Sequence, residues 1–428
     1  MDKVDDQYLR HLFDGDSILN VYKKDVINLS VGAPGPDLLQ NCEEMLLKAT
    51  QHRMEEEKKE GMHYLFQYGI TAGLWECRDE LSKFLSRRYG DSVARENLIL
   101  SYGATHGLHL LLTSIIAPNG VIFVEEVTYM IALRVFEQFP FMKIVVVPMK
   151  NDIVDLNALD KIICESKKKY GPFYTNNDSK IFWSAFYTIP TYHNPTGSAL
   201  PPESCKKLVE IARNHSMAVI CDDVYNLLHY QRGPPPHRLF YYDNNEDINY
   251  QGGNIISNGS LSKILSPAIR LGWIECPPRV ANILRTSGVM TSGGAANHYV
   301  SGVIASLLHL NIQDKYLDLL IEIYTKRLAA VCDVLKRLLP KCCTYHEPTG
   351  GYFIWIHLPP ECNASDFIKW CQETHKVAAI PGSRFSLEGK ANNEFRISIA
   401  FHQVDVLKKA TEILCIALDD YIKNHMKL

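Results

Sequence analysis

Residues 255–272 read Ile-Ile-Ser-Asn-Gly-Ser-Leu-Ser-Lys-Ile-Leu-Ser-Pro-Ala-Ile-Arg-Leu-Gly. The stretch begins as an apolar run that predicts a buried strand, and Ser260, Ser262, Lys263 and Arg270 follow it. A lone lysine is most often a solvated surface residue. In this company Lys263 also suits chemistry, because an amine that attacks a carbonyl group must be partly desolvated and neutral. The hydroxyls and the guanidinium beside it are groups that hold a phosphate.

Short apolar runs alternate with helical patterns along the middle of the chain. The predicted strands are Leu98–Ser101, Val121–Val124, Ile144–Val147, Ile181–Ala185, Ala218–Cys221, Ile255–Ser257 and Leu271–Glu275. Helices such as Thr105–Ile116 and Ser204–His215 are expected between them. This alternation predicts an α/β fold with a mostly parallel seven-stranded sheet between helices. Ligands of such a sheet bind beyond the carboxyl ends of its strands.

The C-terminal third of the chain predicts a second, smaller α+β unit. A long helix is expected from about Val300 to Leu339, and strands and helices alternate again from Thr344 to the end. The length of 428 residues also exceeds what one core usually organises. We expect an N-terminal arm with part of the small domain, a large domain and a small C-terminal domain, over residues 1–45, 46–300 and 301–428. Loops are expected at Tyr170–Ser179, Gln231–Asn254 and Thr291–Asn297.

The composition of the chain limits which binding partners and which cellular compartment are expected. A formal net charge of -3 offers no basic surface for a nucleic acid. The twelve cysteines show no CxxC pair, which predicts reduced thiols. Residues Met1–Asp16 lack the apolar core of a signal peptide, and the longest apolar runs are too short to span a membrane. We therefore expect a cytoplasmic protein with neither a membrane nor a nucleic-acid partner, and with no metal site.

Two further clusters follow predicted strands. Asn194-Pro-Thr-Gly197 is by itself a good turn sequence, since Pro and Gly punctuate loops. Asp222-Asp-Val-Tyr225 directly follows the strand that ends at Cys221, so its side chains can project beyond the end of the sheet. A carboxylate in that place can keep a ring nitrogen protonated. Asp223 is a rival for this role, although the spacing to Tyr225 favours Asp222.

The order of these clusters resembles the class I/II aminotransferases of pyridoxal-phosphate fold type I. The shared pattern is NPTG, then DxxY, then SxSK with an arginine seven residues on, and it extends over most of the chain. The resemblance implies that Lys263 binds pyridoxal 5'-phosphate as a Schiff base. It implies further that Asp222 faces the ring nitrogen, and that Asn194 and Tyr225 hydrogen-bond the ring oxygen. Ser260, Ser262 and Arg270 would bind the phosphate.

Two more segments resemble the family's cofactor site. Gly103, Ala104 and Thr105 lie where a strand gives way to a helix, which is a geometry that binds phosphate through free N–H groups. The family usually has glutamine near the position of His106, where this chain departs from the pattern. Tyr129 matches the aromatic residue that stacks on the pyridine ring, although the proline usual before the Thr-Tyr pair is Val127 here.

Three positions match the family's substrate and dimer contacts. Gly32 lies in Val31-Gly-Ala-Pro-Gly-Pro36, which resembles the loop whose backbone approaches the substrate. Arg396 matches the arginine that grips the substrate carboxylate, which Asn194 is also expected to contact. Tyr68 resembles a tyrosine that reaches the partner's cofactor phosphate, which implies a homodimer. A plain turn, a surface arginine and a core tyrosine are the respective alternatives.

The resemblance implies transamination between an amino acid and a 2-oxo acid, with 2-oxoglutarate as the expected acceptor. The similarity leans toward the kynurenine/aminoadipate or valine/aromatic branch. A lyase or a decarboxylase on the same scaffold is an alternative, because the cofactor activates every bond at the α carbon. A non-catalytic regulator that senses the cofactor is a more distant one, since about thirty residues before Gly32 leave little room for a DNA-binding domain. A cofactor-free homologue is disfavoured by the intact Lys263, Asp222 and Arg270.

Overall fold

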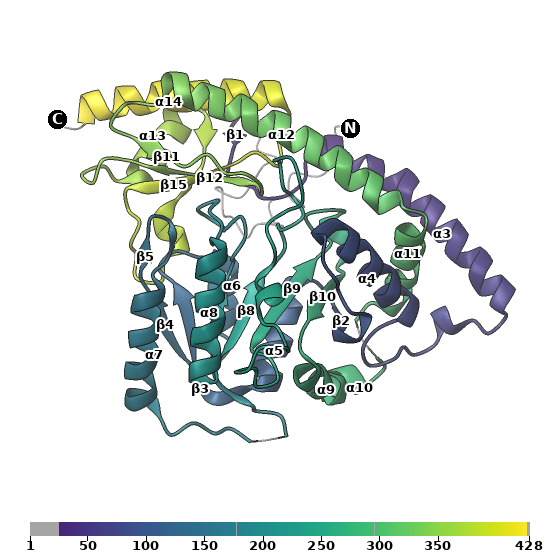
Figure 1. The fold of residues 1–428 in the computed structure, drawn as a ribbon. Helices are drawn as coiled ribbons and strands as arrows, with labels where there is room; N and C mark the ends of the chain where they lie inside the picture. Colours follow the sequence, from purple (N-terminus) through teal and green to yellow (C-terminus); the bar gives the residue numbers. More distant parts are fainter. Residues whose placement is uncertain (1–24, 177, 295, 426–428) are drawn as a thin grey trace.

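The structure is a computed structural model that describes residues 25–176, 178–294 and 296–425. Predictions made for Met1–Asp16, and part of the predicted N-terminal arm, lie outside these residues. The described chain contains a seven-stranded sheet, a four-stranded sheet and two two-stranded sheets, with helices packed around them (Figure 1). No helix of the described part is long and apolar enough to cross a membrane. None of the twelve cysteines is in a disulfide bond.

The larger sheet contains all seven strands that the sequence predicts. Their order is β2-β10-β9-β8-β7-β3-β4. Strand β10 is antiparallel to both of its neighbours and the other adjacent pairs are parallel, so the mostly parallel sheet is confirmed. The bounds are β2 Leu98–Ser101, β3 Ile116–Glu125, β4 Lys143–Val147, β7 Phe182–Thr188, β8 Ala218–Asp222, β9 Ile255–Ser260 and β10 Gly272–Glu275.

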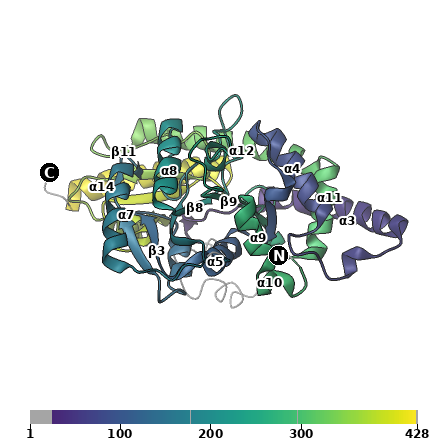
Figure 2. The same ribbon diagram turned by 60° about the horizontal axis from the view of Figure 1, so that its bottom comes forward.

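Both faces of this sheet are buried, which explains why most of its strands are rich in apolar residues. Along β3, Val121 and Phe123 belong to one core cluster, while Ile122 and Val124 belong to the other. Figure 2 shows helices on opposite sides of the strands. The covering helices are α7 Leu156–Tyr170 and α8 Pro202–His215 on one face, and α5 Ala104–Ile115, α6 Met130–Phe136 and α9 Pro278–Thr286 on the other.

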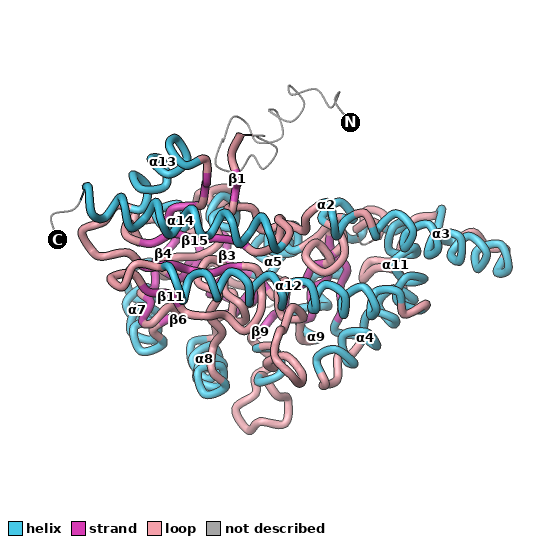
Figure 3. Tube along the Cα trace, turned by 90° about the horizontal axis from the view of Figure 1, so that it is seen from above, coloured by secondary structure: helices cyan, strands magenta, loops and turns pink. Residues whose placement is uncertain are grey.

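The second sheet lies in the C-terminal part, where the sequence predicts new strands. Its order is β11-β12-β15-β14, with bounds Thr344–Tyr345, Phe353–His357, Glu394–Ser398 and Ile380–Pro381. Helix α14 (Val404–His425) lies beside α12 (Ile312–Leu338), as Figure 3 shows from above. The N-terminal strand β1 (Ile27–Asn28) pairs in parallel with β13 (Val377–Ala378). The N-terminal residues Ile27–Asn28 thus pack with the C-terminal part of the chain. The predicted boundaries of the domains remain a prediction.

The predicted long helix from Val300 to Leu339 is wrong in one respect, because it is two helices. Helix α11 ends at His309 and α12 begins at Ile312. Asn311 adopts φ 54, a left-handed conformation that asparagine tolerates better than most residues, and it interrupts the helical hydrogen bonds. The apolar pattern continues on both sides of the break. Periodicity alone therefore could not reveal it.

The predicted loop Gln231–Asn254 is an ordered segment. It contains a short 3-10 helix at Leu239–Tyr242. Arg238, which is almost fully buried, donates hydrogen bonds to Glu275 of β10 at 2.6 and 2.7 Å. These charge-assisted bonds fix the segment against the sheet.

The remaining helices and strands complete the described chain. They are α2 Pro36–Leu39, α3 Asn41–Glu60, α4 Trp75–Tyr89, α10 Gly288–Thr291, α11 His298–His309, α13 Ala364–His375, β5 Met149–Lys150 and β6 Ile153–Val154.

Candidate active site

A cavity of about 250 Å³ lies beyond the carboxyl ends of the parallel strands. Its walls come from the segments that follow β2, β3, β7, β8 and β9 and from the turn before β10. The lining residues are Ala104, Thr105, Leu108, Tyr129, Ala132, Val135, Ile189, Asn194, Asp222, Val224, Tyr225, Ser260, Ser262, Lys263, Pro267 and Arg270. Most of the predicted site residues are therefore brought together in one place.

Lys263 projects into this cavity from the turn after β9. Its Nζ donates a hydrogen bond of 2.7 Å to the carbonyl oxygen of Gly32. The surrounding protein withdraws the amine from bulk water and lowers its pKa to about 8, even though Asp222 opposes the change. A substantial fraction of the amine is thus neutral near pH 8, which is the form that attacks a carbonyl carbon.

Asp222 presents one free carboxylate oxygen to the site. Its Oδ2 accepts a hydrogen bond of 2.7 Å from the hydroxyl of Tyr187, whereas its Oδ1 is buried and has no partner among the described residues. Burial raises the pKa of Asp222 to about 6, against the effect of the Tyr187 hydrogen bond. Asp223, the rival, does not line the cavity and accepts instead from Ser257. The choice of Asp222 is consistent with this geometry.

The expected phosphate cradle is built from a helix start and a turn. Gly103, at φ 86, precedes the first residue of α5, where free N–H groups face the cavity. A Cβ at Gly103 would lie 3.0 Å from the guanidinium of Arg270, so a larger residue would crowd the cradle. On the other wall, Ser260 and Ser262 share a hydroxyl hydrogen bond of 2.9 Å. Arg270 also contacts the carbonyl oxygen of Tyr102 at 3.2 Å.

Arg396 lies behind the cavity on β15. Its guanidinium donates 2.5 Å hydrogen bonds to Asn194 Oδ1 and to the carbonyl oxygen of Ser30. It also lies 3.9 Å above the ring of Phe353. Burial lowers its pKa to about 10, and its Nε has no partner among the described residues. A buried guanidinium with an unused donor is suited to receive a carboxylate.

Two tyrosines complete the walls. Tyr225 is buried, and its hydroxyl is hydrogen-bonded to the side chain of Asn194. Tyr129 is half-buried at the start of α6, and burial raises its pKa to about 12. Both hydroxyls therefore remain protonated and can donate hydrogen bonds at neutral pH.

Gly32 and Tyr68 differ in how the structure places them. A Cβ at Gly32 would lie 2.6 Å from the ring of Phe353, so the close approach of this backbone to Lys263 requires glycine. Tyr68 is 83% exposed and lies outside the cavity, beside Gly293. Its expected role concerns a second chain and remains a prediction.

Three sets of residues that the sequence did not predict also lie at the site. Tyr187, which holds Asp222, lies on β7 beyond the point where the predicted strand ended. Leu108, Ala132 and Val135 line the cavity from helices, and their signal in the sequence is that of ordinary core residues. Tyr352, which hydrogen-bonds the main chain of Lys263, also carries no distinctive signal.

The donor set fits a phosphorylated pyridine aldehyde. The unpartnered Oδ1 of Asp222 suits a protonated ring nitrogen, and the helix start with Arg270 suits a phosphate. Lys263 supplies the amine. Fold and cavity together therefore define a pyridoxal-phosphate enzyme of fold type I.

Comparison with known proteins agrees with this class and narrows it. The sequence profile described as aminotransferase class I and II matches residues 24–414. The chain belongs to this family and is a pyridoxal-phosphate-dependent aminotransferase, as the sequence predicts.

Individual relatives resemble the chain along nearly all of its length. The aromatic-amino-acid aminotransferase 1 of Thermococcus litoralis is 26% identical over 408 residues, which cover 95% of this chain and 90% of that protein. The α-aminoadipate aminotransferase LysN of Thermus thermophilus, solved with N-(5'-phosphopyridoxyl)-L-leucine, is 25% identical with a TM-score of 0.75, and the match covers 94% of each chain. The multiple substrate aminotransferase of Thermococcus profundus has a TM-score of 0.80 at 22% identity, over 99% of this chain and 96% of that one, which shows the shared fold.

Proposed function

We propose that Lys263 is the residue that binds the cofactor and moves the proton during amino-group transfer. The observation that carries this proposal is a partly desolvated amine, with its pKa lowered to about 8, inside a cavity that also holds Asp222. When bound, pyridoxal phosphate supplies an electron-withdrawing ring that weakens the bonds at the substrate's α carbon. Lys263 Nζ, released by the incoming amino group, is then the base that takes the α proton.

The other residues orient the reactants. Arg396 and Asn194, already joined by a hydrogen bond, would bind the substrate carboxylate and so hold the α C–H bond perpendicular to the conjugated plane. Asp222 would hold a proton on the ring nitrogen. Gly103, Ala104, Thr105, Ser260, Ser262 and Arg270 would bind the phosphate, while Tyr129 stacks on the ring and Tyr225 contacts its oxygen.

We propose an aromatic or other long amino acid as the donor and 2-oxoglutarate as the acceptor. A surface depression beside the site is lined by Tyr68, Tyr102 and Tyr299. The tyrosine rings of this depression can pack against an aromatic or other long side chain. The relatives named above as acting on aromatic amino acids and α-aminoadipate support the same branch.

We propose that the enzyme is a cytoplasmic homodimer. Apolar side chains are exposed around the same depression, and patches of this kind mark interaction surfaces. They include Met62, Tyr64, Phe66, Tyr68, Ile70, Val289 and Tyr299. A second copy of the chain packed there would bring Tyr68 toward the partner's phosphate cradle, as the family resemblance implies.

Reductive trapping tests the role of Lys263. Borohydride treatment of the protein with pyridoxal phosphate should attach the cofactor to the peptide that carries Lys263, and Lys263→Ala should lose both the attachment and nearly all turnover. Lys180→Ala is the control. Lys180 is a half-buried lysine that precedes β7, so it lies at the amino ends of the parallel strands and not at the carboxyl ends, where the cavity is. Normal turnover by Lys263→Ala, or attachment to another lysine, would overturn the proposal.

A further inference from the structure

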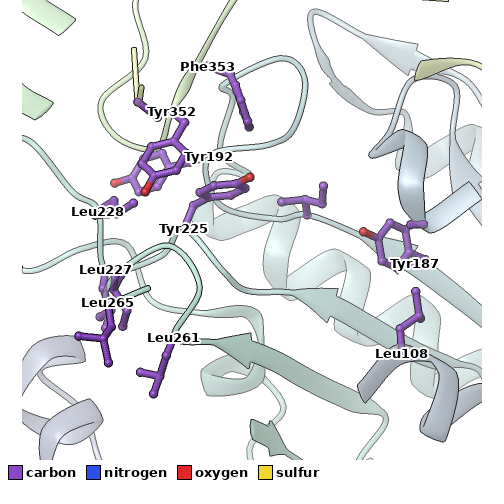
Figure 4. Packing of buried hydrophobic residues seen from close by; sticks show 14 of the residues in the cluster. Leu108, Tyr187, Tyr192, Tyr225, Leu227, Leu228, Leu261, Leu265, Tyr352 and Phe353 are labelled. Atoms are coloured by element: carbon purple, nitrogen blue, oxygen red, sulfur yellow. The ribbon is translucent and has the colours of Figure 1, made fainter. Parts of the chain in front are cut away.

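Lys263 is held at both of its ends by groups from outside the turn that contains it. At the side-chain end, Nζ donates to Gly32. At the main-chain end, the carbonyl oxygen accepts a hydrogen bond of 2.7 Å from the hydroxyl of Tyr352. Tyr352 is 1% exposed and immediately precedes β12 of the smaller sheet. Figure 4 shows it near Tyr225, among the buried side chains around the site.

The main chain around Lys263 needs such an anchor because it is a turn. The turn is closed by bonds from the N–H groups of Ile264 and Leu265 to the carbonyl oxygen of Leu261. The carbonyl of Ile264 is bonded by the side chain of Gln313. For the carbonyl of Lys263, the hydroxyl of Tyr352 is the donor found among the described residues. A buried carbonyl without a donor would carry a desolvation cost, so this contact fixes the turn.

A second hydroxyl fixes the direction of the bond. Tyr324 on α12 has its hydroxyl oxygen 3.2 Å from that of Tyr352. Each phenol has one hydrogen to donate. Because Tyr352 donates its hydrogen to Lys263, Tyr324 must donate to the oxygen of Tyr352. The hydroxyl of Tyr352 is then satisfied as donor and acceptor, and it loses the bond to Lys263 if its hydrogen turns toward Tyr324.

The dipeptide Tyr352-Phe353 also contacts other parts of the site. The ring of Tyr225 packs edge-on against Tyr352, with centroids 5.4 Å apart, and against Phe353 at 5.5 Å. Phe353 in turn lies under the guanidinium of Arg396. The start of β12 thus links the lysine, the tyrosine of the DxxY cluster and the carboxylate-binding arginine.

We propose that Tyr352 is a positioning residue whose hydroxyl holds the main chain of Lys263, and through it the amine, in reach of the substrate's α carbon. The inference rests on the proposed role of Lys263 as the base. Tyr352 touches no reacting atom, so it acts on the rate of proton transfer and not on the affinity for the amino acid or the cofactor.

The test compares three tyrosine-to-phenylalanine variants as cofactor-loaded enzymes. Tyr352→Phe removes the hydroxyl that bonds the carbonyl oxygen of Lys263. Tyr324→Phe removes only the hydroxyl that orients the hydroxyl of Tyr352. Tyr316→Phe is the matched control, since Tyr316 is another buried tyrosine of α12 whose hydroxyl donates to a main-chain carbonyl at 3.1 Å, but to that of Leu38 and not to that of Lys263. The rate constant for a single conversion of amino acid to oxo acid, KM, bound cofactor and melting temperature would be measured for each.

We expect Tyr352→Phe to lower the single-conversion rate constant about tenfold, which corresponds to ~1.4 kcal/mol, with KM and bound cofactor within about twofold of wild type. Tyr324→Phe should lower it by roughly twofold to threefold. Tyr316→Phe should leave it unchanged, although all three should lose some thermal stability. Equal rates for Tyr352→Phe and Tyr316→Phe would overturn the inference.

Two further outcomes separate the proposals. If wild type forms no lysine-bound cofactor, the proposed role of Lys263 fails. If wild type reacts and only the Tyr352 effect is missing, the positioning role alone fails. Should Tyr352→Phe not fold, Tyr324→Phe decides: a rate equal to that of Tyr316→Phe would overturn the inference.

Discussion

At the scale of single residues, two adjacent aspartates offer a direct contrast. Burial raises the pKa of both Asp222 and Asp223 to about 6 from 3.8. A carboxyl group whose pKa is raised in the folded state destabilises that state once it ionises, so its cost is absent below pH 3.8 and complete above about pH 6. Asp222→Asn and Asp223→Asn should each stabilise the cofactor-free protein at pH 7.5, by on the order of 2–3 kcal/mol as an upper value.

Activity separates the two variants. Asp222→Asn should lower turnover by roughly 100-fold or more, because the ring nitrogen loses its charged partner. Asp223 lies outside the cavity, so the Asp223→Asn enzyme should keep most of its activity. Denaturant unfolding from pH 4 to 8 with steady-state assays would measure both effects. Equal activity loss in the two variants would contradict the assignment of Asp222.

Most of the residues that the sequence predicted at the site lie at the end of a strand or shortly after it. Asp222 is the last residue of β8 and Lys263 lies in the turn that follows β9, so chain order alone places them together. Tyr352 comes from the smaller sheet, and its contact with Lys263 depends on how the two sheets pack. Such contacts depend on tertiary structure that local patterns do not encode.

At the scale of elements, an ion-pair bridge connects the four-stranded sheet to the β5–β6 hairpin. His357 at the end of β12 contacts Asp152 of the turn between β5 and β6 at 3.1 Å and Glu394 of β15 at 2.9 Å. Burial disfavours the charged imidazole, but hydrogen bonds to the two carboxylates outweigh it and raise its pKa to about 10. Because Glu394 and Arg396 share a face of β15, the bridge also braces the arginine's strand.

Removing this charge should change how stability depends on pH. A histidine whose pKa is raised from 6.5 to about 10 stabilises the fold fully below pH 6.5, and the effect is lost as pH rises through about 10. We expect His357→Asn to melt below wild type at pH 7 and at nearly the same temperature near pH 10.5. The control is His346→Asn, since His346 is an exposed histidine directly after β11 of the same sheet. A constant difference across this range would contradict the bridge.

Elements were predicted well where one pattern dominates. All seven strands of the large sheet were found because both faces are buried and each strand contains a short run of apolar residues. The break at Asn311 was missed because one residue with positive φ leaves the apolar periodicity intact. The extension of β7 to Thr188 was missed for a related reason, since it includes polar residues that are buried by the site itself.

At the scale of the whole molecule, the proposed homodimer predicts that two inactive variants restore each other. Lys263→Ala lacks the amine but keeps Tyr68, and Tyr68→Ala keeps the amine. In a mixed dimer, one site would combine Lys263 of one chain with Tyr68 of its partner. Random reassociation should therefore recover about a quarter of wild-type activity, since half of the dimers are mixed and each has one intact site.

Gel filtration with activity assays on the separate and the co-refolded variants would measure this recovery. Wild type should elute as a dimer. A mixture that stays inactive although mixed dimers form would contradict the shared site, and an active wild-type monomer would contradict the dimer itself.

The central claim, that Lys263 performs amino-group transfer on bound pyridoxal phosphate, is tested most directly by one spectroscopic experiment. Single amino acids, including kynurenine, 2-aminoadipate, valine and tyrosine, would be added to the loaded enzyme without any oxo acid. We expect at least one of these amino acids to convert the absorption of the lysine-bound cofactor to that of the pyridoxamine form. One equivalent of the matching 2-oxo acid should be released. Persistent absorption of the lysine-bound form together with release of ammonia or carbon dioxide would contradict transamination in favour of lyase or decarboxylase chemistry.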